Sequence, residues 1–286
     1  MTSHFSKMAL LAGLFLASFS NGQEANTKKS VPIDLSHWKI TIPESNPKNP
    51  GSPIEVGYPE ILDYANNPVL KKWMFNDEKD KSIVFYAFPS GTTTANSHFS
   101  RSELRETMVP GNNNVNWTFA QGGKFNGTYA IDAVSKEKDG RYSKVIIAQI
   151  HGRLTNAQRD LIGQKDNNAP PMLKISWDNG KIRVKTKVLK DLNVSDKEIL
   201  KVSSWTDDDG INFKEKVDFE KFTLEVKIFD GRMEVILNGN ETLVYNDINI
   251  KKWGVFENYF KAGNYFQSKE LDSFAKVKIY LLEVSH

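Results

Sequence analysis

Three short segments of the chain place polar side chains at alternate positions. The first is Arg101-Ser102-Glu103-Leu104-Arg105, the second is Gln149-Ile150-His151, and the third runs from Tyr259 to Gln267 with the sequence YFKAGNYFQ. In a β-strand, alternate residues project from the same face. The spacing therefore predicts one polar face that carries nine residues: Arg101, Glu103, Arg105, Gln149, His151, Tyr259, Lys261, Tyr265 and Gln267.

The residues between these polar positions are apolar and are expected to face a core. They are Ile146, Ala148, Ile150, Phe260, Ala262 and Phe266. On the polar side, arginine offers a planar, bidentate donor for carboxylates and glutamine adds a neutral donor. Histidine, with an ordinary pKa of about 6.5, and tyrosine, with one of about 10, can transfer protons when neighbouring charges shift these values. The set is suited to proton transfer beside a bound carboxylate.

Each segment also has a plainer interpretation when it is considered alone. Arg101, Glu103 and Arg105 could form an exposed ladder of charges, which contributes little to stability. Gln149 and His151 could be a hydrogen-bonded pair on a solvated strand, and tyrosines are common in strands as packing residues. The ordered combination of the three segments favours a functional face over these interpretations.

Together the three segments resemble the alginate lyases of polysaccharide lyase family seven. That family has an Arg-Ser/Thr-Glu-Leu/Val-Arg strand, a Gln-Ile/Val-His strand and a Tyr-Phe-Lys-Ala-Gly-x-Tyr-x-Gln strand, in this order. The resemblance covers roughly Ile33 to His286. It implies an all-β fold, a single-domain β-jelly roll sandwich with a concave substrate groove. It also implies a polysaccharide lyase that cleaves alginate, an anionic polysaccharide, by β-elimination.

The resemblance implies a role for each residue of the polar face. Elimination removes the C5 hydrogen of a uronic acid and protonates the departing O4, so the sugar carboxylate must be neutralised. Arg105 and Gln149 are the expected neutralisers, with Arg101 as a partner. Tyr265 is the expected acid, and also the base when hydrogen and leaving group lie on one side, whereas His151 is the candidate base when they lie on opposite sides.

The remaining residues of the face are expected to support these four. Glu103 would hold the arginines through ion pairs, and Tyr259, Lys261 and Gln267 would contact sugars. Ile150 in the Gln-x-His segment hints at guluronate-containing blocks, and we expect endolytic action. No metal and no organic cofactor is implied, and Asp207-Asp208-Asp209-Gly210 lacks the spacing of a calcium loop.

The start of the chain reads as a secretory signal. Lys7 precedes an apolar run, Met8 to Phe19, that is too short to span a bilayer comfortably, and small residues follow. We expect a signal peptide over 1–22, a flexible tail over 23–32 and one catalytic domain over 33–286. The product would be a secreted or periplasmic monomer that is not bound to the membrane once the signal is removed; an N-terminal membrane anchor is the alternative.

Composition narrows the remaining possibilities. The chain has no Cys, which removes disulfides and thiolate chemistry. Its formal charge of +3, from 38 basic and 35 acidic residues, argues against a general nucleic-acid binder. A basic stripe at Lys181, Arg183, Lys185 and Lys187 could steer an anionic polymer or could protect a solvated edge from aggregation.

Short alternating runs separated by turn residues predict many strands and a sandwich or jelly roll. The clearest hairpin runs from Lys221 to Asn238 with Asp230-Gly231 at its turn, and a final strand is expected from Ala275 to Leu281. Helices are expected only near 59–65 and 156–162. The segment from Pro43 to Pro59, rich in Pro, Asn and Gly, reads as a long surface loop.

Two other functions fit such a fold. A jelly-roll glycoside hydrolase needs two carboxylates flanking the bond, and the Glu-x-Asp-x-x-Glu pattern of the common jelly-roll glucanases does not occur. A non-catalytic carbohydrate-binding module would hold the polymer through aromatic residues and arginines, but it has no need for a histidine and a tyrosine at one carboxylate.

Overall fold

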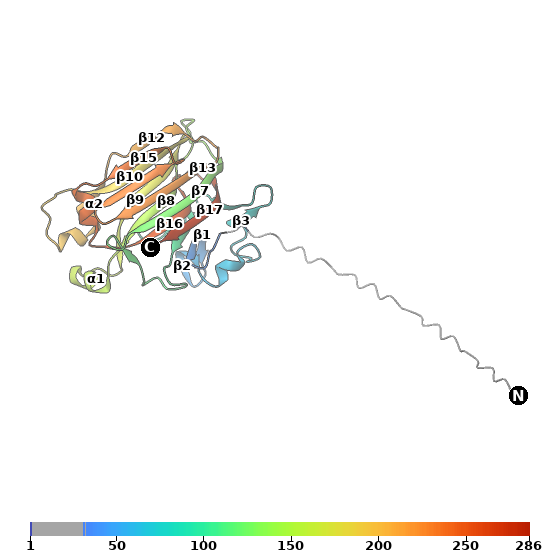
Figure 1. The fold of residues 1–286 in the computed structure, drawn as a ribbon, viewed down its shortest axis with the longest axis horizontal. Helices are drawn as coiled ribbons and strands as arrows, with labels where there is room; N and C mark the ends of the chain where they lie inside the picture. The colour runs from blue at the N-terminus through green and yellow to red at the C-terminus, as the bar shows by residue number, and fades with distance from the viewer. Residues whose placement is uncertain (2–30, 32) are drawn as a thin grey trace.

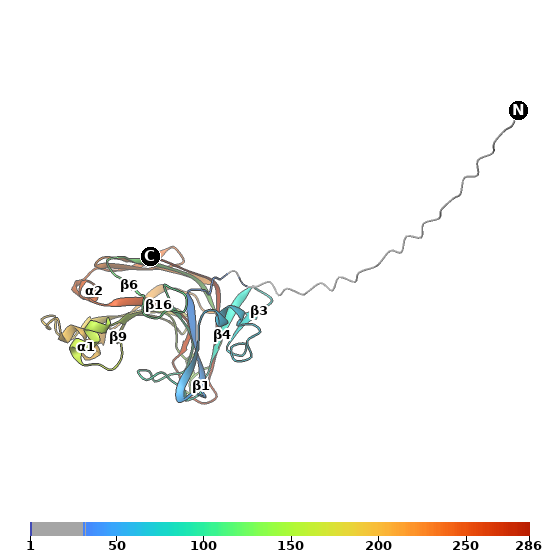
Figure 2. The same ribbon diagram turned by 90° about the horizontal axis from the view of Figure 1, so that it is seen from below.

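A computed structural model describes Met1, Val31 and residues 33–286 of the 286-residue chain, so the expected signal peptide and tail otherwise lie outside the described residues. Two antiparallel sheets pack against each other, in agreement with the predicted all-β sandwich (Figure 1, Figure 2). Among the described residues, no helix is long and apolar enough to cross a membrane.

The ten-stranded sheet has the order β11-β10-β9-β8-β16-β5-β1-β2, with β12 also on β10 and β6 on β16. Its strands are β1 (Trp38–Asn46), β2 (Asn49–Val56), β5 (Arg101–Glu106), β6 (Trp117–Thr118), β8 (Val145–Arg153), β9 (Asn168–Asp178), β10 (Lys181–Leu189), β11 (Trp205–Asp207), β12 (Ile211–Lys216) and β16 (Glu257–Phe266).

The seven-stranded sheet has the order β15-β14-β13-β7-β17-β4-β3. Its strands are β3 (Met74–Asp77), β4 (Ser82–Ala87), β7 (Gly123–Val134), β13 (Phe222–Phe229), β14 (Arg232–Leu237), β15 (Glu241–Tyr245) and β17 (Ala275–Ser285). The predicted hairpin is confirmed as β13 and β14, with Val226 opposite Val235, and the predicted final strand is confirmed as part of β17.

The core lies between the two sheets and is rich in aromatic residues. Phe85 and Phe125 come from the seven-stranded sheet, whereas Trp38, Trp117 and Phe260 come from the ten-stranded sheet, and each is at most 2 % exposed. Burying such side chains is the main source of folding free energy. Because the apolar positions of β5, β8 and β16 are used here, their polar positions must face away from the core.

The helices are short. The two expected segments form the 3-10 turn η1 (Glu60–Asp63) and helix α1 (Asn156–Ile162), which begins with a capping box at Thr155 and Gln158. Two more 3-10 turns, η2 (Glu198–Leu200) and η3 (Val202–Ser204), precede β11. Helix α2 (Ile248–Trp253) was not predicted, although Asp247 caps its first turn.

The expectation of a long loop from Pro43 to Pro59 was wrong. β1 continues to Asn46 and pairs with β2, with Ile42 opposite Ile54 and Ile40 opposite Val56. β2 is the last strand of its sheet. An edge strand tolerates prolines because one row of its amide groups needs no partner, so the composition indicated a loop where the chain forms an edge.

The expected orientation of Ile146 was also wrong. β8 contains a register shift between Ile146 and Ala148, so that Ile147 is an additional residue relative to the neighbouring strands. Ile147 joins the buried core, whereas Ile146 lies opposite Tyr265 on the polar side. A β-bulge of this kind reverses the alternation before it.

Candidate active site

Three neighbouring strands bring the predicted residues together. β16 lies between β8 and β5, and its register sets Lys261 opposite both Gln149 and Arg105. Residues directly opposite each other in antiparallel strands share a face. By the same register His151 lies opposite Tyr259, and Arg101 lies opposite Tyr265. The described strands thus carry the expected polar face, with Gln267 just beyond the end of β16.

Glu103 is the centre of this face. Its carboxylate, 1 % exposed, accepts hydrogen bonds from Arg101 at 2.9 Å, Lys261 at 2.5 Å and the Gln149 amide at 2.5 Å. Burial opposes its charge, but Lys261 and Arg101 lower the pKa of this carboxyl below its usual value. One buried anion thus meets two cations, and positive charge is left over on the polar face.

The surplus positive charge affects the pKa of Lys261. Burial lowers the pKa of its ammonium to about 8, Glu103 acts in the opposite direction, and the positive charge of Arg101 lowers the value further. Lys261 is 7 % exposed and was expected to contact sugar. In the structure its ammonium is bound to Glu103, so Lys261 organises the centre of the site.

The backbone at position 263 explains why the third segment contains a glycine there. Its φ is +129°, and a Cβ at this position would lie 2.8 Å from the Ser102 carbonyl oxygen and 3.2 Å from Cα of Glu103. Only glycine accepts this conformation and this close approach without strain. The register of β16 against β8 shifts between Ala262 and Tyr265 at this point, which places Tyr265 opposite Ile146.

Arg101 lies over the ring of Tyr265, with its Cζ atom 3.7 Å from the ring centroid. Such a cation–π contact fixes the positions of both side chains. Arg101 is 8 % exposed, and its Nε has no hydrogen-bond partner among the described residues. A buried donor without a partner is costly unless a ligand satisfies it, so Arg101 is ready to accept an anion.

His151 is held as a neutral base. Its Nδ1 lies 2.9 Å from the Gly152 carbonyl oxygen, and because a carbonyl only accepts, the proton is on Nδ1 and Nε2 carries the free lone pair. Burial, followed by the charge of Lys261, lowers the pKa of His151 to about 3. Its ring stacks on Tyr259 at 5.3 Å between centroids.

Arg105 is held differently from what the sequence predicted. Glu103 was expected to pair with both arginines, but of these two arginines it pairs with Arg101 alone. The terminal nitrogens of Arg105 donate instead to Asn113, to Asn116 and to the Glu106 carbonyl oxygen, and its guanidinium lies 4.1 Å from the Tyr259 ring. The physical reason is reach: the asparagines lie in the connection between β5 and β6, which folds back over Arg105.

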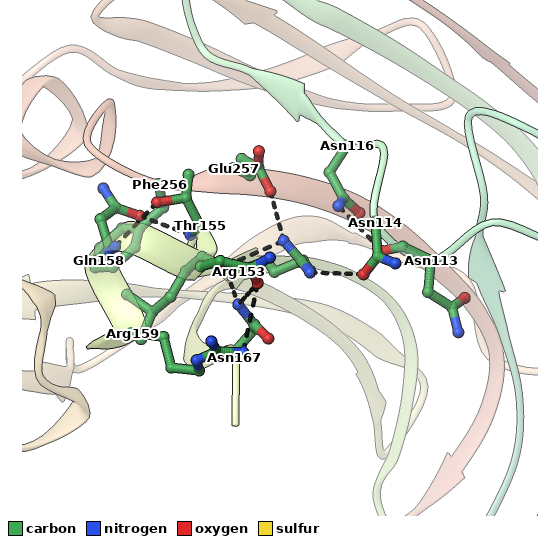
Figure 3. A network of polar contacts seen from close by, with 12 residues as sticks. Asn113, Asn114, Asn116, Arg153, Thr155, Gln158, Arg159, Asn167, Phe256 and Glu257 are labelled. Carbon is green, nitrogen blue, oxygen red and sulfur yellow. Dashed lines mark hydrogen bonds and ion pairs between the residues drawn. The ribbon is translucent and has the colours of Figure 1, made fainter. Parts of the chain in front are cut away.

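These asparagines were not predicted as part of the site. A second arginine, Arg153, donates to Asn114 at 2.9 Å and to Glu257 at 2.8 Å (Figure 3). Together with Arg105, it holds the segment 113–116 against the sheet. The signal in the sequence was a run of three asparagines at 112–114, preceded by Pro110 and Gly111, which reads as an ordinary turn.

Gln267 was expected on the polar face. Its amide donates to the Tyr265 carbonyl oxygen, and its side chain lines a surface cavity together with Lys144 and Lys269. It therefore lies at one end of the face, beyond Tyr265, and not among the residues around Glu103.

The fold and the face define a β-sandwich with a buried, cation-rich site on one sheet. The sequence model described as "Alginate lyase" matches residues 33–286, so the chain belongs to the alginate lyase family. A search of curated proteins found no match.

Solved structures agree with the family. Alginate lyase A1-II′, described as a member of polysaccharide lyase family 7, is 28 % identical with a TM-score of 0.68, covering 89 % of this chain and 96 % of its own. A variant of it, with a histidine changed to asparagine and a tyrosine to phenylalanine, in complex with the substrate GGMG, is 27 % identical with a TM-score of 0.69, covering 88 % and 94 %. An alginate lyase from Pseudomonas aeruginosa, 23 % identical with a TM-score of 0.63 and coverage of 88 % and 99 %, shares the fold. The predicted family and jelly-roll class are therefore confirmed.

Proposed function

We propose that this chain is an exported, endolytic alginate lyase that cleaves guluronate-containing blocks by β-elimination. The observation that carries the proposal is the buried Glu103 cluster, in which one carboxylate faces two cations and an amide. The surplus positive charge suits a uronate carboxylate. Tyr265 and His151, on the same face, supply groups that can move protons.

Arg101 and Gln149 are the first partners of the sugar carboxylate in this proposal. Arg101 has a buried Nε free to donate, and only one hydrogen of the Gln149 amide has a described partner. The terminal nitrogens of Arg105 are already bonded to Asn113 and Asn116. Arg105 therefore contributes to the site through its positive charge and not through a direct hydrogen bond to the sugar. Charge that builds on the carboxylate during elimination is stabilised by these fixed donors.

The reaction then needs two proton transfers. A base takes the proton from C5, the C4–O4 bond breaks as the C4–C5 double bond forms, and O4 receives a proton. Tyr265 donates this proton in our proposal, and Nε2 of His151 is the base for guluronate. The low pKa of free His151 rises when a sugar carboxylate adds negative charge beside it.

Related structures support these assignments. The enzyme A1-II′ was captured with the substrate GGMG after one histidine and one tyrosine had been substituted, and with the product GGG after a tyrosine was changed to phenylalanine. A histidine and a tyrosine are also the two proton-transfer candidates of the present chain. The inference carries over because the family is shared and the identity is 27 to 28 %.

Three finer parts of the proposal rest on separate observations. Endolytic action is supported by polar side chains on both sides of the Glu103 cluster, from Lys39 on β1 to Lys174 on β9. Export is supported by the apolar segment near the start of the sequence, and guluronate preference by Ile150.

The direct test is incubation of the purified protein with alginate. An unsaturated product that absorbs ultraviolet light, absent with Tyr265→Phe, supports the lyase. New reducing ends without unsaturation would indicate a hydrolase, and retention on alginate without cleavage would indicate a binding module. Blocks enriched in guluronate or mannuronate, followed by product sizing, test the preference and the endolytic mode.

A further inference from the structure

The polar face does not end at the Glu103 cluster. β9 and β10 continue the sheet beyond β8 (Figure 1). Their register extends one cross-strand row outward, because Lys174 lies opposite Gln149 and Lys185 lies opposite Lys174. Neighbouring strands are about 4.8 Å apart. The row therefore continues across five strands and consists of Arg105, Lys261, Gln149, Lys174 and Lys185.

A second row runs parallel to the first and also ends in a cation. It consists of Arg101, Tyr265, Ile146, Ser176 and Arg183. The residues between the basic positions of β10 are buried, with Ile182 and Val184 at 0 % exposure. Lys185 and Arg183 consequently share the face of the catalytic candidates.

β10 is not an edge strand, because β11 and β12 pair with its outer side. A role as a charged edge that blocks aggregation, one of the two interpretations of the sequence, therefore does not explain the stripe. The remaining interpretation is binding of an anionic polymer.

Positive charge is in excess on this outer part of the face. Lys174 and Lys187 share one carboxylate, Asp207, at 2.5 and 2.6 Å. Arg183 donates to two neutral acceptors, the Asn212 side chain and the Asp209 carbonyl oxygen. The neighbouring Asp208 carboxylate is bonded to Thr186.

Lys185 is the cation with the fewest partners. In the described part of the chain, no carboxylate lies within ion-pair distance of its ammonium. Burial, followed by the positive charges of Lys187 and Lys185, lowers the pKa of Lys174, although Asp207 opposes the shift. The neighbourhood therefore has room for another negative charge.

The stem of Lys185 is held in place by the backbone of Gly210. This glycine has φ +74°, and a Cβ there would lie 2.7 Å from Cγ of Lys185 and 3.1 Å from Nε of Arg183. The absence of a side chain lets the segment after β11 pack closely along both basic side chains. Such contact restricts the side chains before a ligand arrives and reduces the entropy lost on binding.

We propose that Lys185, with Lys174 and Arg183, forms an additional binding site for uronate carboxylates, away from the bond that is cleaved. The inference rests on the proposed function, because a polymer lying over Tyr265 reaches these residues by continuing across β9 and β10. Short chains would not reach the site, whereas long chains would occupy it.

The test compares full-length wild type and Lys185→Ala on oligouronates of increasing length, measured by formation of the unsaturated product. We expect KM for long chains to rise about two- to fivefold, as for a partly exposed ion pair, with kcat unchanged and no effect on the shortest cleaved oligomers. High salt should remove the difference, and Lys185→Arg should restore the wild-type KM.

The matched control is Lys276→Ala. Lys276 is also partly buried and lies in β17 of the other sheet, and no ion pair is described for it. A KM that is equal for wild type and Lys185→Ala at every length would overturn the additional site, as would an equal shift in Lys276→Ala. If wild type forms no unsaturated product, the proposed function fails, and calorimetry with uncleaved oligouronates then decides on the site: weaker binding by Lys185→Ala alone supports it, and unchanged binding overturns it.

Discussion

Two ion clusters lie on opposite sheets of the sandwich, and their ratios of cations to carboxylates are opposite. On the seven-stranded sheet the ammonium of Lys278 meets three carboxylates, those of Asp77 at 2.8 Å, Asp80 at 2.9 Å and Asp132 at 3.1 Å. On the ten-stranded sheet one carboxylate, Glu103, meets the cations of Arg101 and Lys261. The first cluster has surplus negative charge and the second has surplus positive charge.

The two lysines respond in opposite directions. Burial opposes the charge of Lys278, but hydrogen bonds from its ammonium to Asp77 and Asp80 raise its pKa. Burial lowers the pKa of Lys261, and Arg101 lowers it further. The two surpluses differ in their access to water. The three carboxylates around Lys278 are 22 to 32 % exposed, whereas the side chains of Arg101 and Lys261 are each 9 % exposed. Surplus charge in a buried place is typical of a site completed by an anionic ligand.

The largest effect is expected when one carboxylate is removed from each cluster. Glu103→Gln leaves two buried cations without their anion and should lower the free energy of unfolding by about 3 kcal/mol or more. Asp80→Asn leaves Lys278 with two carboxylates and should cost less than about 1 kcal/mol. Urea denaturation of both variants measures the difference. Equal losses would mean that the two clusters serve the same structural purpose.

Tyr265→Phe should retain the fold and lose turnover, because it removes only the transferable proton and keeps the ring beside Arg101. A loss of roughly 10²-fold or more in kcat is expected for a proton-transfer group. Tyr280→Phe is the matched change at the other cluster, where the phenol donates to Asp80 at 2.9 Å. It should leave kcat unchanged. A Tyr265→Phe enzyme with wild-type turnover would contradict the proton-donor role.

His151→Ala should damage guluronate cleavage more than mannuronate cleavage, by about tenfold or more if a base is lost. The two sugars differ in configuration at C5, so Tyr265 can serve both proton transfers for only one of them. His286→Gln is the control, since this histidine pairs with the buried Glu106. Rates on the two block types should keep their ratio in the control. Equal losses on both types in His151→Ala would remove the two-base mechanism.

Much of this arrangement follows from alternation in the sequence. The alternating residues from Arg101 to Arg105 predicted their shared face without knowledge of the fold, because a regular strand has a period of two. Ile146 was placed wrongly because one bulged residue, Ile147, reverses that period. No local pattern in the sequence announces such a bulge.

The partners of Arg105 could not be predicted for a different reason. Alternation states which face a side chain shares, but the chain segment that covers this face depends on how the turn after β5 folds back. The sequence showed that Asn113 and Asn116 lie in a turn, and only the structure shows that they bind Arg105. Arg105 therefore had a predictable position and an unpredictable set of partners.

The smallest expected effect concerns pH. Because the pKa of Lys261 is about 8, its ammonium loses the proton above that pH, and the surplus positive charge that receives the sugar carboxylate declines. Activity should fall by about three- to tenfold between pH 7 and 9. Lys261→Arg, which keeps its charge, should remove this alkaline decline, whereas Lys278→Arg should leave it unchanged because the raised pKa of Lys278 keeps that lysine charged throughout.

The sign of the stability change separates this effect from unfolding. The pKa of Lys261 is lower in the folded protein than its ordinary value of 10.5, so between about pH 8 and 10.5 the unfolded chain binds more protons at this residue and its contribution to stability increases with pH. Activity and this contribution should therefore move in opposite directions. The measurement is a pH–rate profile alongside denaturation curves of wild type and Lys261→Arg. The quantity compared is the unfolding free energy of wild type relative to that of Lys261→Arg. If it decreases over the pH range in which activity falls, the decline in activity reflects unfolding and not the charge of the site.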